Sequence, residues 1–102
     1  SYDALLSLKG IGPYTAAAIA SFAYNLPHPV CDGNVIRVMS RLEAITDPIQ
    51  SSQGKKAISM ALNLWFDPLQ PALFNQSIME LGALICAPKN PQCMSCPFMD
   101  IC

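Results

Sequence analysis

The sequence predicts an all-α fold, and three observations lead to this prediction. Apolar residues recur at helical spacing in three stretches between residues 32 and 85. Prolines, asparagines and glycines separate the stretches, at positions where helices begin or end. No stretch shows the strict alternation of apolar and polar residues that indicates a half-buried strand, and there is no internal repeat or low-complexity run.

The first two predicted helices are joined by a short glycine-containing turn. Residues 2–8 read as the end of a helix, and Gly10 suits the position just after it. Pro13 can occupy the first position of the next helix, because its missing N–H is not needed there. Four alanines among residues 16–20 favour that helix, and Asn25 can end it.

Residues 26–31 contain two prolines and are predicted to be extended or turned, with His28 exposed to solvent. Asp32 then caps a helix that runs to about residue 44. Asp-Pro pairs at residues 47–48 and 67–68 frame a further helix over about residues 52–66, with Trp65 in the core. Pro71 opens the last helix, which reaches about residue 85.

Composition indicates a chain with more apolar surface than it can bury. Of its 102 residues, 52% are hydrophobic and only 13% are charged, against about 25% charged in typical domains. We therefore expect a segment of a longer protein, and self-association of the isolated chain through uncovered apolar surface. The net charge of −1 and the lack of a basic block predict weak nonspecific attraction to nucleic acid. No apolar run is long enough to cross a membrane.

The turn over residues 8–12, Leu-Lys-Gly-Ile-Gly, has the features of an anion site. Two glycines allow positive φ and close approach of another backbone. The N–H groups of residues 10–15 are predicted to lack internal partners and to point outward, as at helix N-termini that bind phosphate. Leu8 and Ile11 would pin the turn from inside. An ordinary corner between two helices is the alternative interpretation.

Asp32 also admits two interpretations. A carboxylate at an N-cap accepts a backbone N–H and stabilises its helix by about 1 kcal/mol. The same carboxylate can be a catalytic group. Arg37 and Arg41 lie four residues apart on the helix that follows, where such pairs are usually solvated, although they are able to reach phosphate.

Four of the five cysteines fall in the last 17 residues, with the spacing C-x6-C-x2-C-x5-C: Cys86, Cys93, Cys96 and Cys102. Four neighbouring thiolates repel one another unless a metal neutralises them. Cysteine ligation with one C-x2-C pair suits an iron–sulfur cluster or structural zinc, and disulfides remain a third alternative. Cys31 stands apart and reads as a small apolar filler.

Together, the turn over residues 8–12, Asp32 and the four-cysteine segment resemble the helix-hairpin-helix DNA glycosylases of the endonuclease III superfamily. The endonuclease III branch carries a lysine at the position of Tyr14. Tyr14 and the string Asp32-Gly33-Asn34-Val35 resemble instead the MutY-like adenine glycosylases. The resemblance implies an incomplete endonuclease III-like fold with a helix-hairpin-helix over residues 1–25. A helical part of the cluster domain would span residues 26–85. A loop over residues 86–102 would hold a [4Fe–4S] cluster through the four cysteines.

The resemblance also implies an activity, namely hydrolytic removal of adenine mispaired with 8-oxoguanine or guanine in double-stranded DNA. The flipped adenine would leave a positively charged sugar, which Asp32 would stabilise while Tyr14 and Asn34 hold Asp32 and the water or intermediate in place. The enzyme would act inside the cell with DNA, in the bacterial cytoplasm or the eukaryotic nucleus or mitochondrion. The residues implied to bind DNA are Leu8, Gly10, Ile11, Gly12, Tyr14 and Thr15.

Some parts of such an enzyme are expected to lie outside this chain. The glutamate that protonates adenine lies upstream of the hairpin in MutY-like relatives, and a C-terminal domain reads 8-oxoguanine. We therefore expect the isolated chain to be inactive. The alternatives are an endonuclease III-like glycosylase acting on oxidised pyrimidines, a noncatalytic iron–sulfur module that binds DNA or carries electrons, and a zinc-stabilised helical interaction domain.

Overall fold

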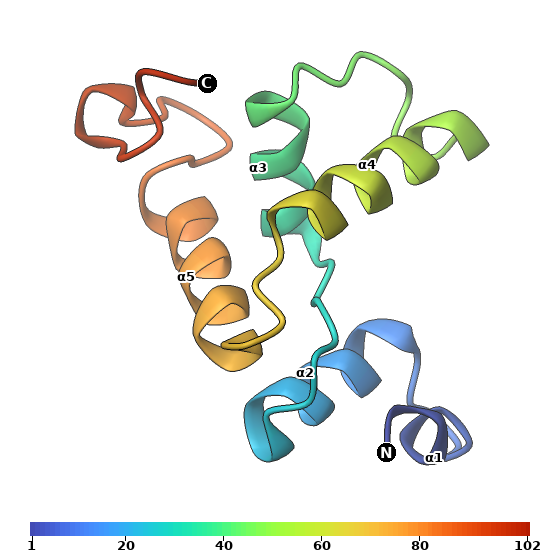
Figure 1. Cartoon of the computed structure of the whole chain (residues 1–102). Coiled ribbons are helices and arrows are strands. Elements are labelled where there is room, and N and C mark those ends of the chain that lie inside the picture. Colours follow the sequence, from blue (N-terminus) through green and yellow to red (C-terminus); the bar gives the residue numbers. More distant parts are fainter.

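The computed structural model describes all of residues 1–102 and is entirely helical, as predicted (Figure 1). No strand is present. The elements are the helices α1 (Tyr2–Leu6), α2 (Pro13–Tyr24), α3 (Gly33–Leu42), α4 (Ser52–Trp65) and α5 (Pro71–Leu84), followed by the short 3-10 helix η1 (Cys93–Ser95).

The helix starts agree with the local sequence. Pro13 and Pro71 each occupy the first turn of their helix, and Ser51 caps α4 by accepting the Gly54 N–H at 3.0 Å. Asn25 ends α2 in the left-handed conformation, with φ 53°. These positions follow from residue-level preferences that need no tertiary contact.

Two helix ends fall earlier than predicted. Helix α1 stops at Leu6, because Ser7 already caps it and its hydroxyl donates to the Ala4 carbonyl at 2.6 Å. Helix α3 stops at Leu42, and Ala44 then takes a φ of 50°, which reverses the chain. The apolar periodicity extends past both ends, so periodicity alone placed them too far along the chain.

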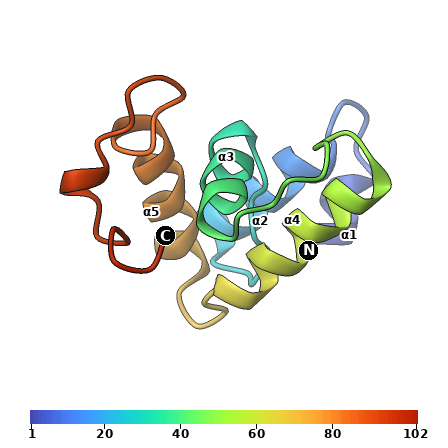
Figure 2. The same ribbon diagram turned by 90° about the horizontal axis from the view of Figure 1, so that it is seen from above.

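The helices form an elongated body with extents of 41 × 29 × 23 Å. Figures 1 and 2 both place α1 and α2 at one end and the cysteine segment at the other, with α3 and α5 between them. Helix α3 packs against α4 and α5, while α2 packs against α1 and α5. A connector, residues 26–32, joins α2 to α3 (Figure 1).

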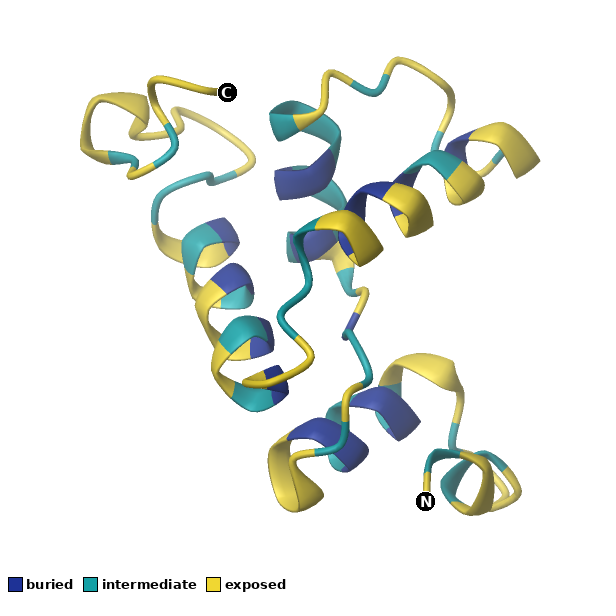
Figure 3. Cartoon of the chain, viewed as in Figure 1, coloured by how far each residue is buried: buried dark blue, intermediate teal, exposed yellow.

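The main core lies where α3, α4 and α5 face one another (Figure 3). Its buried residues are Val35, Val38, Met39, Ile58, Ala61, Leu62 and Ile78. Helix α2 contributes a separate thin face of small residues, which lets its neighbours approach closely: Ala16, Ala17, Ala20 and Ser21 are buried. Trp65 is only partly buried and packs at the edge of the main core.

Many large apolar side chains remain exposed, in keeping with the surplus in the sequence. On α4 and α5 and the turn between them these are Met60, Leu64, Leu69, Leu73 and Leu84. A cavity of about 440 Å³ opens beside Met60 and Leu64. Self-association through such surface stays a prediction. None of the helices is both long and apolar enough for a membrane span.

Candidate functional site

The corner between α1 and α2 presents free backbone N–H groups. Gly10 has a φ of 86°, a conformation that side chains disfavour. Gly12 instead caps α2 with an extended backbone, φ −90° and ψ 179°. Between Ser7 and Ala16, the N–H groups that find no acceptor within the chain are those of Lys9, Gly10, Gly12, Tyr14 and Thr15. The corner therefore offers unpaired backbone donors to an anion.

Two details of the corner differ from the prediction. The Ile11 N–H is not free, because it donates to the Leu8 carbonyl at 3.2 Å. Leu8 does not pin the turn from inside either, since its side chain is 56% exposed. The turn is closed by that backbone hydrogen bond, which leaves the Leu8 side chain available at the surface.

Asp32 is the N-cap of α3, as the sequence indicated. Its Oδ1 accepts the Val35 N–H at 2.9 Å, and its Oδ2 accepts the Asn34 side-chain amide at 3.3 Å. The structure thus brings two predicted site residues, Asp32 and Asn34, into direct contact. Both are partly buried, so the carboxylate is anchored by two donors and still borders solvent.

Tyr14 makes no hydrogen bond to this carboxylate. Its side chain is 47% exposed and lines a cavity of about 330 Å³. Pro29 and Cys31 of the connector line the same cavity. The corner and Cys31, the residue preceding Asp32, therefore face a common space.

His28 is not the exposed loop residue that the sequence suggested. Its ring stacks on Tyr2 of α1, with centroids 4.4 Å apart and planes 15° from parallel. Tyr2 and His28 are far apart in sequence, so no local pattern indicates the stack. The contact ties α1 to the connector next to the shared cavity.

Arg37 and Arg41 are half-buried and hydrogen-bonded within the chain, which corrects the prediction of a solvated pair. Arg37 donates to the Cys86 carbonyl at 2.8 Å, to the Asn34 amide oxygen at 2.9 Å and to the Gly82 carbonyl. Arg41 donates to the Cys86 sulfur at 3.4 Å and to the Ala87 carbonyl at 2.7 Å. The i, i+4 spacing that suggested a surface pair places both guanidinium groups against the start of the cysteine segment.

The four clustered cysteines line one cavity of about 250 Å³, together with Arg41, Ile85, Pro91 and Met99. Two N–H···S contacts of 3.4 Å are aimed at sulfur, from Arg41 to Cys86 and from the Phe98 backbone to Cys96. No three His, Cys, Asp or Glu side chains are grouped so that they could hold a metal ion. The thiols thus surround a shared space without converging on one point.

Trp65 fixes the cysteine segment to the helical core. Its indole N–H donates to Glu43 at 2.8 Å, and its ring meets Phe98 edge-on at a centroid distance of 5.6 Å. Phe98 lies between Cys96 and Cys102, so this contact positions the second half of the segment. The sequence suggested a core role for Trp65, and the structure places it at the core's edge.

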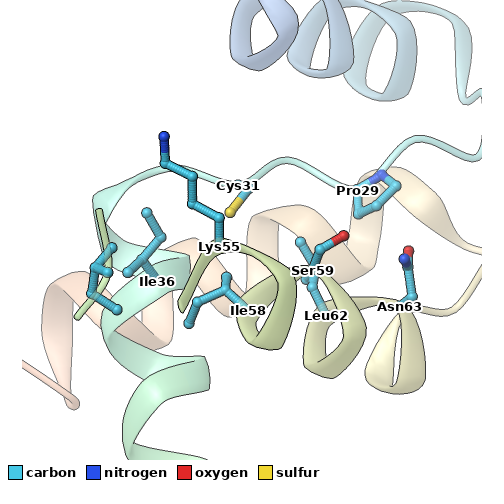
Figure 4. A pocket seen from close by; sticks show the side chains of 9 residues that line it. Pro29, Cys31, Ile36, Lys55, Ile58, Ser59, Leu62 and Asn63 are labelled. Carbon is cyan, nitrogen blue, oxygen red and sulfur yellow. The ribbon is translucent and has the colours of Figure 1, made fainter. Parts of the chain in front are cut away.

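Cys31 is not an apolar filler, because much of the residue is exposed. Its thiol points into a second cavity of about 250 Å³ between the connector and α4, near Lys55 and Ser59 (Figure 4). Desolvation by burial raises the pKa of the Cys31 thiol, and the neighbouring Asp32 charge raises it further. Cys31 is therefore a poor nucleophile at neutral pH.

Comparison with known proteins agrees with this geometry. The helix-hairpin-helix motif family matches residues 1–22, which contain the corner. The adenine DNA glycosylase of Arabidopsis thaliana is 49% identical over 101 residues, which is 98% of this chain and 16% of that protein. The adenine DNA glycosylases of Schizosaccharomyces pombe and Homo sapiens are 44% and 45% identical, each over 93% of this chain.

The chain is similar over nearly its whole length to one segment of these adenine DNA glycosylases. It spans 21% and 17% of the Schizosaccharomyces pombe and Homo sapiens proteins. The MutY-like resemblance seen in the corner and around Asp32 thus extends over nearly all of the chain. The all-helical structure with this motif is consistent with the endonuclease III-like fold.

Proposed function

We propose that this chain is the part of a base-excision-repair adenine DNA glycosylase that grips DNA and carries the catalytic aspartate. The whole enzyme would hydrolyse the N-glycosidic bond of adenine mispaired with 8-oxoguanine or guanine. The observation that carries the proposal is that Asp32, held by Asn34, directly follows Cys31, which lines one cavity together with Tyr14 of the corner.

In this proposal the corner binds one DNA phosphate. Five unpaired N–H groups between Lys9 and Thr15 supply donors without formal charge, which fits a chain of net charge −1. The exposed Leu8 side chain precedes these donors. Backbone contacts of this kind position the duplex and carry no sequence information.

Asp32 would act on the positive charge that develops on the sugar as the base leaves. Two unit charges about 4 Å apart interact by about 4 kcal/mol at an effective dielectric constant of 20. That energy corresponds to about a thousandfold in rate. Asn34 would orient the carboxylate through the hydrogen bond described above, and Tyr14 would line the same space as the sugar.

The general acid that protonates adenine and the domain that reads 8-oxoguanine would come from other parts of the enzyme. The Glu43 carboxylate accepts a hydrogen bond from the Trp65 indole. The Glu80 carboxylate accepts one from the Gln76 side chain at 2.7 Å, on the exposed face of α5. Neither glutamate faces the cavity at Tyr14. The isolated chain should therefore release no adenine, whereas the complete enzyme should.

The test is adenine release from a duplex with adenine opposite 8-oxoguanine, using the full-length protein that contains this chain. We expect release of the base without strand cleavage, and no adduct after borohydride reduction. Tyr14 occupies the position where a Schiff-base lysine would be required. A borohydride-trapped adduct would instead support the endonuclease III-like alternative, and the absence of any base release would support a noncatalytic module.

We further propose that Cys86, Cys93, Cys96 and Cys102 hold a [4Fe–4S] cluster. Their thiols share one cavity with mostly apolar neighbours, and soft sulfur donors suit iron–sulfur clusters or zinc. The resemblance to the MutY-like glycosylases favours the cluster over a single zinc ion. When bound, the cluster would supply four iron–sulfur bonds that crosslink the segment. Residues 86–102 would then form the cluster loop of the predicted domain division.

Anaerobically purified protein should contain iron and acid-labile sulfide in equal amounts, with the visible absorbance of a cluster. The Cys96→Ser variant should lose most of its iron and acid-labile sulfide, because the substitution removes one of the four ligands. Cys31→Ser is the matched control and should retain both, since Cys31 lies outside the cavity. Zinc in place of iron would contradict the proposed cluster and favour the zinc-stabilised alternative.

A further inference from the structure

The connector between α2 and α3 has little structure of its own. Pro27 and Pro29 lack N–H groups, so the connector cannot form a regular hydrogen-bonded pattern. The buried side chain of Asn75 on α5 supplies what is missing. Its Oδ1 accepts the Val30 N–H at 3.1 Å, and its Nδ2 donates to the His28 carbonyl at 3.0 Å. The amide thus pairs with the connector as a neighbouring strand would.

Both partners in this contact are fully enclosed. Asn75 is 1% exposed and Val30 is 0% exposed. A buried amide without partners is costly, so the side chain is held to this geometry. Two hydrogen bonds to residues on either side of Pro29 fix both the position and the direction of the connector.

Helix α5 runs alongside the connector in the same direction. Ala72 N–H reaches the Asn25 side chain at 3.4 Å, Asn75 holds residues 28–30, and Gly82 meets Asn34. Between Ala72 and Gly82 the helix advances about 15 Å, whereas the chain from Asn25 to Asn34 could extend to about 30 Å. The connector therefore has slack, and its length alone does not determine its path.

The Gly82 contact completes the alignment next to Asp32. A Cβ on Gly82 would lie 2.8 Å from the Cβ of Asn34 and 3.0 Å from its carbonyl oxygen, so only glycine allows this approach. The Gly82 carbonyl also accepts from Arg37. This contact fixes α3 itself, while Asn75 fixes the chain that leads into Asp32.

We propose that Asn75 is a positioning residue that sets the place of Asp32 relative to the phosphate-binding corner, acting through the backbone of residues 28–30. The inference rests on the proposed glycosylase function and deepens it. The corner lies on α1 and α2, and Asp32 begins α3, so the two halves of the site meet only through the connector and α5. The Asn75 side chain joins the connector to α5 at a point between the corner and Asp32.

The test is Asn75→Ala in the full-length glycosylase, with Asn63→Ala as the control because Asn63 is an exposed asparagine on α4. A displacement of about 1 Å at a reacting centre lowers rates up to a hundredfold. We expect the single-turnover rate constant for adenine release to fall about tenfold or more. Affinity for a duplex with a non-hydrolysable adenosine analogue should stay within about threefold, because the corner is unchanged. Active molecules are counted by titration with that duplex.

A purely structural role predicts a different result, in which the active fraction falls and the rate constant per active molecule is unchanged. That result would overturn the proposal. Asn75→Asp serves if the alanine variant does not fold, since it retains the acceptor for Val30 and loses the donor to His28. A rate constant per active molecule below that of the wild type supports the proposal, and the wild-type rate constant for this variant opposes it.

A second readout does not depend on adenine chemistry. In crystal structures of the wild type and Asn75→Ala, superposed on the corner, the Asp32 carboxylate should move by about 1 Å. An unmoved carboxylate would contradict the positioning role even if the enzyme acts on another base. Conversely, a wild-type enzyme that releases no adenine refutes the proposed function, and the displacement still decides the role of Asn75.

Discussion

Replacing Asp32 with asparagine in the full-length glycosylase should lower the single-turnover rate of adenine release about a thousandfold. The substitution removes one negative charge. The attraction of that charge to a cationic sugar about 4 Å away is about 4 kcal/mol at an effective dielectric constant of 20. Asparagine caps helices as well as aspartate does, so the Val35 N–H keeps its partner. The loss should therefore appear in the chemical step and leave the fold intact.

Asp47→Asn is the matched control, because Asp47 is an exposed aspartate in the loop after α3. It changes the net charge equally and should leave the rate within about twofold. The melting temperatures of both variants should lie close to that of the wild type. Excision at the wild-type rate by Asp32→Asn would show that residue 32 is a cap alone and would overturn its proposed catalytic role.

The parts of the site that were predicted correctly depend on neighbours in sequence. Pro13 and Asn25 bound α2 through their own backbone preferences, and Asp32 caps α3 through the N–H three residues later. The cysteines share a cavity because a segment this short keeps them close. The adenine-glycosylase interpretation required resemblance, since spacing alone did not distinguish among the possible activities.

The parts that were missed depend on the register of one helix against another. Arg37 meets Cys86 across 49 positions and Gly82 across 45, and Asn75 reaches His28 across 47. Periodicity indicates which face of a helix is apolar, but not which partner that face meets. A half-buried arginine with three acceptors and an exposed one therefore look alike in the sequence.

Replacing Arg37 with methionine should lower adenine release about a hundredfold, the second-largest effect expected. Methionine keeps the apolar stem but removes the donors to Asn34, Gly82 and Cys86. Asn34 then loses the contact that orients its amide toward Asp32, and a misplaced group at a reacting centre costs up to about a hundredfold. Single-turnover rates, expressed per iron-loaded molecule, measure this effect apart from any loss of the cluster.

Arg41→Met separates orientation of Asn34 from attachment of the cysteine segment. Arg41 donates to Cys86, Ala87 and Pro88 and has no contact with Asn34. This variant should lose iron more readily than the wild type, while its iron-loaded molecules release adenine within about threefold of the wild-type rate. If the rates of Arg37→Met and Arg41→Met per iron-loaded molecule fell equally, the cysteine segment as a whole would govern the site. The Arg37–Asn34 contact would then have no separate role.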